Sequence, residues 1–367
     1  MTSSSSSSSP VWAVPRGTEG VRIMVEGAAA HGTTTSECLA GTGIDPRDLT
    51  DEDAQIWAHQ EFAVIRNLLG RLGDRPGLGV EIGAHSTIGR TGAIGFMMLA
   101  GPTVRAALER AVPYLALSPT HLRFSLEVGS AEGADGGAFL VAADDEIPAD
   151  VRTFVVERDL SGLAVAFRGA QIELGPLGLE TTLGPESARL LGEAWGLGPE
   201  AVTPGAADNR LAVSREALDA RLPQGDENTA RLFERQCRDL LAERLARVGV
   251  AGQIRSRLRH ERHSWPSMND VAAELHVDVR TLRRRLAAEG TSYRRLVDEV
   301  RHERARELLA QGVPVARIAD ELGYSETSTF TRSFRRWEDA PPSRIRRMMD
   351  GGRAVPGRAT ADEGDSG

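Results

Sequence analysis

The chain has 367 residues, 41% hydrophobic and 26% charged, which is typical of a globular protein long enough for two domains. All 44 basic residues are arginine, and 52 acidic residues leave a formal net charge of -8, which disfavours indiscriminate binding to polyanions. Two distant cysteines, Cys38 and Cys237, argue against a disulfide framework or a zinc site. We expect a cytoplasmic protein without a metal, a cofactor or a membrane partner.

The two ends of the chain are polar and of low complexity. Residues 1–20 begin with a run of serines, and residues 351–367 are rich in glycine, alanine and acidic residues. Neither segment can bury a hydrophobic core, so both are predicted to be disordered. The N-terminal segment has neither the basic region nor the apolar region of a signal peptide.

Helical periods appear three times between residues 21 and 225. Apolar residues recur at helical spacing over residues 51–74, and again over 103–117, where Pro113 must kink or end the helix. A longer helix is predicted over residues 153–170.

Strand patterns alternate with these helices. Residues 122–128 place apolar side chains on one face, and residues 137–143 are a suitable pairing strand. A further strand is predicted over residues 171–175. This mixture predicts an α/β domain over residues 21–225.

A long apolar stripe marks residues 226–248 as a connecting helix. Its members recur near helical spacing: Leu232, Phe233, Cys237, Leu240, Leu241 and Leu245. Such a stripe either packs on its own domain or pairs with a second copy in a dimer. The sequence leaves both interpretations open.

The C-terminal part, residues 249–350, contains an internal repeat. "VAAELHVDVRTLRRRL" and "IADELGYSETSTFTRSF" each read as a helix, a tight turn and a second helix. The turns fall at His276 and Gly323, and the second helices are predicted to be capped by Asp278 and Ser325. This layout is that of a helix-turn-helix, whose second helix enters the major groove of DNA.

The two second helices are amphipathic, with basic and hydroxyl groups on the outer face. Leu282 and Leu286 point inward in the first, and Phe330, Phe334 and Trp337 form the inner stripe of the second. Arginine can bind guanine bidentately, and serine or threonine can bond base edges. Residues 251–350 hold 20 Arg against 15 Asp and Glu, a net of +5, so the basic surface is local. The predicted outer faces carry Arg280, Arg283 and Arg284 in the first helix, and Thr327, Ser328, Thr331, Arg332 and Arg335 in the second.

The helix predicted between the two units ends near Gly312. It would hold them about one turn of DNA apart, ~34 Å, so that both enter adjacent major grooves of double-stranded DNA. The fold class is thus mixed: an α/β domain followed by an all-α domain with two helix-turn-helix units joined by a linker helix.

Residues 249–347 resemble the DNA-binding domain of AraC/XylS-family transcriptional regulators. The resemblance lies in "RTLRRRLAAEGTSYRRLVDEVRHERARELL" and "IADELGYSETSTFTRSFRRW". Glu338 and Asp339 stand where the family has a polar residue and glycine, which predicts a strained or differently shaped turn. The resemblance implies base contacts from the outer-face residues named above, with Arg335 and Thr281 on phosphates.

Residues 21–225 resemble the arabinose-binding-like sensor domain of a subset of these regulators. The matching stretches include "LGDRPGLGVEIGAHSTIGRTGAIGFMMLAG". The resemblance implies a small-molecule effector and a homodimer, with RNA polymerase as a further partner if the protein activates transcription. No effector-binding residue is identified, although Phe96, Met97 and Met98 could line a pocket or simply form core.

Two other functions remain open from the sequence: an enzyme fused to a DNA-binding module, and a regulator whose first domain only dimerises or binds a protein. No catalytic residue is expected. "GLGVEIG" misses the dinucleotide fingerprint, and turn and packing glycines explain it better. His31, His59, His85 and His121 are scattered, and His260 and His263 fit an exposed helix better than a metal site. We therefore predict a DNA-binding regulator and no enzyme.

Overall fold

The computed structural model of the chain describes residues 13–51, 54–128, 137–260 and 265–351. Of the segments predicted to be disordered, residues 1–12 and 352–367 lie outside this described part. The prediction is wrong for residues 13–20, since Ala13 and Val14 are buried and a helix begins at Glu19, and it is wrong for Gly351, which ends a helix. Contacts divide the chain into two compact units: residues 1–260 with 273–277, and residues 261–272 with 278–367. The domain boundaries expected at residues 225 and 249 stay predictions.

The first unit is built from ten α-helices and five strands among its described residues. In chain order they are α1 (Glu19–Ala29), α2 (Thr35–Leu39), α3 (Ala58–Leu72), α4 (Leu78–Gly83), α5 (Ala93–Leu99), α6 (Val104–Ala111), β1 (Arg123–Val128), β2 (Ala138–Ala143), α7 (Arg152–Gly169), β3 (Gly178–Thr181), α8 (Pro185–Ala194), β4 (Val202–Pro204), β5 (Asn209–Val213), α9 (Arg215–Asp219) and α10 (Glu227–His260). Short 3₁₀ helices occur at Pro46–Leu49, Ile88–Thr91, Val112–Leu117 and Pro199–Ala201.

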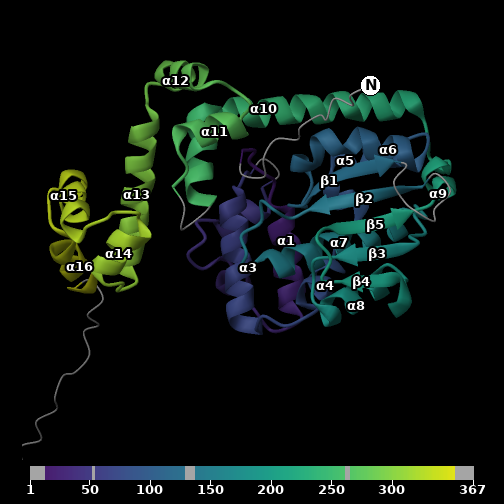
Figure 1. Ribbon diagram of the computed structural model, residues 1–367, viewed down its shortest axis with the longest axis horizontal. Helices are drawn as coiled ribbons and strands as arrows, with labels where there is room; N and C mark the ends of the chain where they lie inside the picture. The colour runs from purple at the N-terminus through teal and green to yellow at the C-terminus, as the bar shows by residue number, and fades with distance from the viewer. Residues whose placement is uncertain (1–12, 52–53, 129–136, 261–264, 352–367) are drawn as a thin grey trace, which may run out of the picture. The chain divides into compact units, whose positions relative to one another are not determined.

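The five strands form one sheet in the order β1-β2-β5-β3-β4. They lie side by side in Figure 1, with α6 beside β1 and α8 beside β4. All neighbouring pairs are antiparallel except β3 with β4. Leu211 is central, since it pairs with Leu140 on one side and Leu179 on the other. The predicted pairing of residues 122–128 with 137–143 is confirmed.

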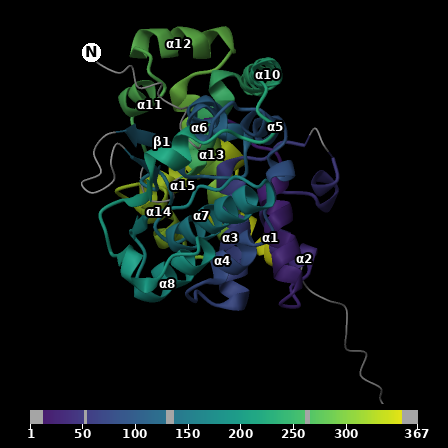
Figure 2. The same ribbon diagram turned by 90° about the vertical axis from the view of Figure 1, so that its right-hand side faces the viewer.

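Helix α7 forms the centre of the first unit. Buried side chains surround it, from Phe154 to Phe167, as expected of a helix covered on all sides. Close approach to α4 depends on two glycines: a Cβ on Gly79 would lie 2.4 Å from the carbonyl oxygen of Phe154, and one on Gly83 would lie 2.5 Å from that of Arg158. The glycines of "GLGVEIG" therefore serve packing, as predicted. Helices α1, α3 and α4 lie together in Figure 2.

The three predicted helices of this unit are present as α3, α6 and α7, but α3 is shorter than predicted. It begins at Ala58, and Ile56 lies before it in an antiparallel bridge with Arg16. α3 ends before Gly73, which adopts a left-handed φ of 83°. α6 ends at Ala111, and the chain continues as a 3₁₀ helix that has Pro113 near its start. Pro113 has no backbone N–H to extend the α-helical ladder, so it ends the α-helix as expected.

The strand predicted over residues 171–175 is wrong. Gln171 and Gly175 have positive φ angles of 58° and 46°, which an extended strand does not allow. The N–H of Ile172 donates to the carbonyl of Phe167 at 2.9 Å and so closes α7. Ile172 is buried as part of a helix terminus, and the next strand is β3.

α10 extends beyond the predicted 226–248 helix and contains a break. Gly249 has φ 59° and ψ -176°, which is not helical. Cys237 is buried against the core of the unit, and Phe233 packs beside it, whereas Leu232 and Leu240 are 55% and 37% exposed. Figure 2 shows α10 end-on, next to α5. Part of the apolar stripe thus packs on its own unit, and part faces outward.

The C-terminal part is entirely helical in its described residues. Its elements are α11 (Met268–Glu274), α12 (Val279–Ala288), α13 (Tyr293–Ala310), α14 (Val315–Glu321), α15 (Thr327–Glu338) and α16 (Pro342–Gly351). α13 is the predicted linker helix, and Gly312 follows its end with φ 79°. The mixed fold class is confirmed. Among the described helices, none combines the length and hydrophobicity that a membrane span requires.

Candidate nucleic-acid interface and internal cavity

The first helix-turn-helix is formed by α11 and α12. His276 lies in the turn with a left-handed φ of 52°. The carboxylate of Asp278 accepts a hydrogen bond from the Thr281 N–H at 2.7 Å, which caps α12. The turn at His276 and the cap at Asp278 are confirmed.

The second helix-turn-helix, α14 and α15, has a similar turn and a different cap. Gly323 takes φ 72° at the expected place. α15 begins at Thr327, so the N-cap position belongs to Glu326, which makes no side-chain capping bond. The predicted cap at Ser325 is therefore wrong, because the one extra residue in this turn moves the helix start. Glu326 instead accepts a hydrogen bond from the Ser328 hydroxyl at 2.9 Å.

The outer face of α12 is basic. Leu282 and Leu286 are buried, at 0% and 1% exposure. Arg280, Arg283 and Arg284 are exposed, as predicted. Two neighbours modify this face: Arg285 is exposed as well, and the half-buried Thr281 donates its hydroxyl to Asp278 at 2.9 Å.

The outer face of α15 combines hydroxyl groups with guanidinium groups. Phe330 and Phe334 are fully buried, with ring centroids 5.7 Å apart, while Trp337 is half-buried. The exposed residues are Thr327, Ser328, Arg332 and Arg335. Thr331 is half-buried, and its hydroxyl donates to the Thr327 carbonyl at 2.8 Å. The inner and outer faces follow the predicted division, and the DNA contacts themselves stay predictions.

The guanidinium groups on these two outer faces have no carboxylate partner in the part of the chain that the structure describes. Other arginines of the C-terminal part are different: Arg304 pairs with Glu321 at 2.6 Å, and Arg336 with Asp298 at 3.5 Å. The outer-face arginines can therefore offer their planar donor forks to phosphate or to guanine.

The turn after α15 keeps a left-handed residue although glycine is absent. Asp339 adopts φ 52° and ψ 16°, and its N–H donates to the Arg335 carbonyl at 2.9 Å. Glu338 contacts His302 and lies 3.5 Å from Arg306, both on α13. The predicted strain is thus located at Asp339, since left-handed backbone favours glycine over other residues.

A cavity of about 110 Å³ lies inside the first unit. Helices α1, α5, α6 and α7 and the sheet surround it with mainly apolar side chains. Met98 lines it, whereas Met97 lies in the core and Phe96 is half exposed against Phe233. The apolar lining includes Ile23, Met98, Leu108, Leu115, Leu140 and Phe167.

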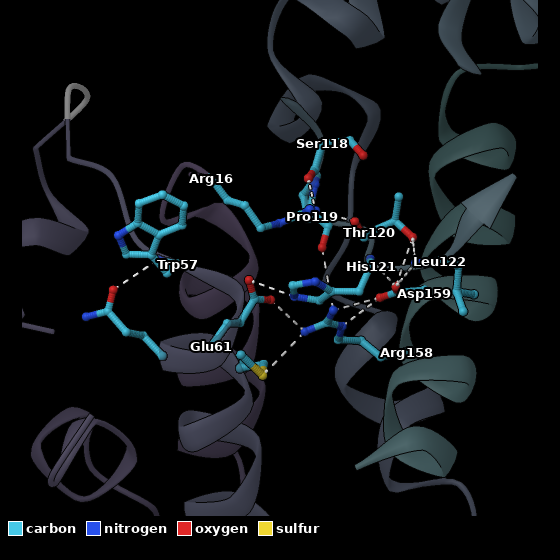
Figure 3. A network of polar contacts seen from close by, with 12 residues as sticks. Arg16, Trp57, Glu61, Ser118, Pro119, Thr120, His121, Leu122, Arg158 and Asp159 are labelled. Atoms are coloured by element: carbon cyan, nitrogen blue, oxygen red, sulfur yellow. Dashed lines mark hydrogen bonds and ion pairs between the residues drawn. The ribbon is translucent and has the colours of Figure 1, made fainter. Parts of the chain in front are cut away.

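A buried charged cluster (Figure 3) lies beside the cavity and contributes Arg158 and Asp159 to its lining. Nη1 of Arg158 lies 2.9 Å from Oε1 of Glu61, and Nη2 lies 2.8 Å from Oδ1 of Asp159. Nε2 of His121 lies 3.0 Å from Oε2 of Glu61. Arg16 is also buried, and its guanidinium donates to the Ser118 carbonyl at 2.6 Å. Two guanidinium groups thus balance two carboxylates in the interior.

Burial and charge shift the pKa values of this cluster. Burial lowers the pKa of His121, and Glu61 only partly opposes this, so His121 is neutral at pH 7. Burial alone would raise the pKa of Glu61, but His121, Arg158 and Arg16 outweigh it and lower that pKa to about 2. A neutral His121 has no charge to lower this pKa, but its Nε2–H can still donate to Oε2 of Glu61, so it acts together with the two arginines.

Sequence reasoning missed this cluster because its members are distant in the chain, and His121 was placed as scattered surface or core. One signal was present: "VVERDLSGL" in α7 places three successive charged residues in an otherwise apolar helix. Buried charges require partners. Among the described residues, no group of three or more His, Cys, Asp or Glu could hold a metal ion; His263 lies outside the described residues.

Two family models cover most of the chain. The model described as the arabinose-binding domain of AraC transcription regulator, N-term, matches residues 32–222. A helix-turn-helix domain model matches residues 271–348.

Similar proteins cover nearly the same length. An uncharacterised HTH-type transcriptional regulator of Mycobacterium tuberculosis is 36% identical over 333 residues, which are 89% of this chain and 94% of that protein. The ornithine utilization regulator of Pseudomonas aeruginosa is 27% identical over 329 residues, 87% and 92% of the two chains. The solved structure of the transcriptional regulator CdpR from Pseudomonas aeruginosa is 24% identical, with a TM-score of 0.44, and the match covers 90% of this chain and 98% of that one. The chain belongs to the AraC family of DNA-binding transcriptional regulators, with a ligand-sensing domain before its helix-turn-helix domain.

Proposed function

We propose that α12 and α15 each enter one of two adjacent major grooves of a DNA site, and that a small molecule in the cavity of the first unit alters this binding. The observation that carries the proposal is the pair of outer faces, where arginines that have no carboxylate partner among the described residues follow matching turns. Regulation then occurs by binding in the cytoplasm and not by catalysis.

The proposed contacts divide into base readers and phosphate contacts. In α12 the base readers are Arg280, Arg283 and Arg284, and Thr281 contacts a phosphate. In α15 they are Thr327, Ser328, Thr331 and Arg332, and Arg335 contacts a phosphate. A long, exposed guanidinium suits guanine O6 and N7, whereas phosphate contacts position the helix without reading sequence.

Selection of duplexes from a random DNA pool tests this division. The full-length protein should select a bipartite motif with half-sites about 10 bp apart. Arg284→Ala and Arg332→Ala should each weaken binding to the selected site by about 1–3 kcal/mol and relax the preference at one position. Arg189→Ala is the matched control, because Arg189 is an exposed arginine of α8, 49% exposed.

The outcomes separate the possible roles of these arginines. Equal weakening on all sequences would make the substituted residue a phosphate contact. Binding unchanged in both variants, as in the Arg189 control, would remove α12 and α15 from the interface.

A homodimer is the further assembly that we propose, through the outward face of α10. Leu232 and Leu240 are large apolar side chains exposed there, and burying them against a second copy would remove apolar surface from water. Leu232→Glu should shift sedimentation toward the monomer, while Ala242→Glu on the same helix should not. If the protein activates transcription, RNA polymerase is an additional partner.

A further inference from the structure

We infer that the cavity in the first unit takes a small, uncharged, apolar molecule, about the size of one aromatic ring, and not a sugar or an amino acid. This rests on the proposed function in one respect: the cavity is taken as the effector site. The description of the matching family model and the ornithine regulator among the relatives both suggest polar ligands. The chemistry of the cavity wall instead favours an apolar ligand.

Most of the wall consists of hydrocarbon. Met98 from α5, Leu108 from α6, and Leu163 and Phe167 from α7 line the cavity, and Leu140 of the sheet completes it. Such side chains offer dispersion contacts and no hydrogen bonds, so they favour an apolar ligand.

The charged groups in the wall are already engaged with one another. Nε of Arg158 donates to Oδ1 of Asp159 at 2.8 Å, and Nη1 donates to Oε1 of Glu61 at 2.9 Å. Oδ2 of Asp159 accepts from the Thr120 hydroxyl at 2.8 Å and from the His121 N–H at 2.6 Å. A ligand that claimed these groups would have to break a balanced buried network.

Three hydroxyl groups of the wall, those of Thr91, Ser118 and Thr120, are engaged in the same way. Ser118 donates to the Leu115 carbonyl at 2.7 Å, and Thr91 donates to the Ile88 carbonyl. Ser86 is half-buried and Thr87 is exposed, so water can reach both. A sugar carries a hydroxyl on nearly every carbon, and most of these would lose water without gaining a partner in a lining that is mainly apolar.

The size of the cavity sets the size of the ligand. Its volume is about 110 Å³, and an apolar cavity of about 150 Å³ in another protein stays dry and binds benzene. A single ring or a short branched hydrocarbon therefore fits this space.

The test uses the full-length protein and fluorobenzene, followed by ¹⁹F NMR line broadening. Fluorobenzene should bind, and neither arabinose nor ornithine should displace it. Ala166 is buried and lines the cavity, so Ala166→Phe should weaken binding at least about tenfold by filling the space. Val165→Phe is the matched control, because the neighbouring Val165 is outside the lining.

A second variant covers the case in which Ala166→Phe does not fold. Leu108 also lines the cavity, and Leu108→Ala should admit 1-fluoronaphthalene, which the unchanged protein should bind more weakly. A failure of Leu108→Ala to improve binding of the larger probe would overturn the assignment of the cavity as the site.

Three further results would overturn the inference: no binding of fluorobenzene, its displacement by arabinose or ornithine, or equal losses in Ala166→Phe and Val165→Phe. Binding of the selected DNA is measured on the same samples. If DNA binding is retained alongside any of these results, only the proposal of an apolar ligand is refuted. If the unchanged protein fails to select a DNA motif, the proposed function itself is refuted.

Discussion

Replacement of Glu61 by glutamine should strongly destabilise the first unit. The side chain is 1% exposed, and it contacts Arg158 at 2.9 Å and His121 at 3.0 Å. Glutamine preserves the shape but removes one of the two carboxylates that balance Arg158 and Arg16. A buried guanidinium then loses its counter-charge, and removal of one partner of a buried pair costs about 3–5 kcal/mol.

Thermal unfolding of the full-length protein measures this loss. For a unit of this size 1 kcal/mol corresponds to about 2–4 °C, so the transition of the first unit should fall by about 6–20 °C. The matched control is Glu193→Gln, which removes a carboxylate from the pair with Arg189, where both side chains are about half exposed, 58% and 49%. Exposed pairs contribute little, so its transition should hardly move.

The outcome that would refute this reasoning is a shift in Glu61→Gln no larger than that in Glu193→Gln. The buried network would then be held by hydrogen bonds that an amide satisfies equally well, and charge balance would not be its basis.

Three further predictions concern backbone conformation and pH. Gly323→Ala should destabilise the second unit, because Gly323 has φ 72° and a Cβ would lie 3.0 Å from Trp265; Gly89→Ala, with open space around it, is the control in a thermal melt. Asp339→Gly should stabilise it by about 1 kcal/mol in urea unfolding by relieving the left-handed residue; no gain would mean that the aspartate is unstrained. Burial lowers the pKa of His121, so the unfolded chain binds the proton first and stability should fall as pH drops below about 6.5. His121→Asn should show a flatter stability profile between pH 7.5 and 5.5, and an unchanged slope would assign the effect to another group.

Sequence periodicity was sufficient to predict an element where the apolar spacing within that element alone determines its structure. Local spacing and turn chemistry determine several elements, and these were predicted: the helix before Gly73, the end of α6 near Pro113, the β1–β2 pair and both helix-turn-helix units. The strand at residues 171–175 failed for the opposite reason. Its apolar residues are buried because of the way α7 ends. The sequence pattern does not indicate that Gln171 adopts a left-handed φ, which a strand would not allow.

The faces of the candidate DNA site were predictable, and the cavity was not. Exposure of Arg284 or Arg332 follows from helical period alone. The charged cluster beside the cavity brings together Arg16, Glu61 and Arg158, which meet only when the whole unit folds. The cap of α15 was missed by one residue, since alignment of the repeats does not show where an inserted residue enters a turn.

The break at Gly249 has a mechanical consequence. An unbroken α-helix is a stiff shaft, and a rotation imposed on one end reappears at the other. In α10 the left-handed φ of 59° at Gly249 interrupts the shaft between its first 22 residues, 227–248, and the turns that end at His260. A rotation of the first segment can therefore be taken up by changes in φ and ψ of Gly249, because glycine has the widest range of allowed backbone angles. A joint at Gly249 would limit how far the second segment can move from the first. It would pass on little rotation unless its backbone angles were held fixed.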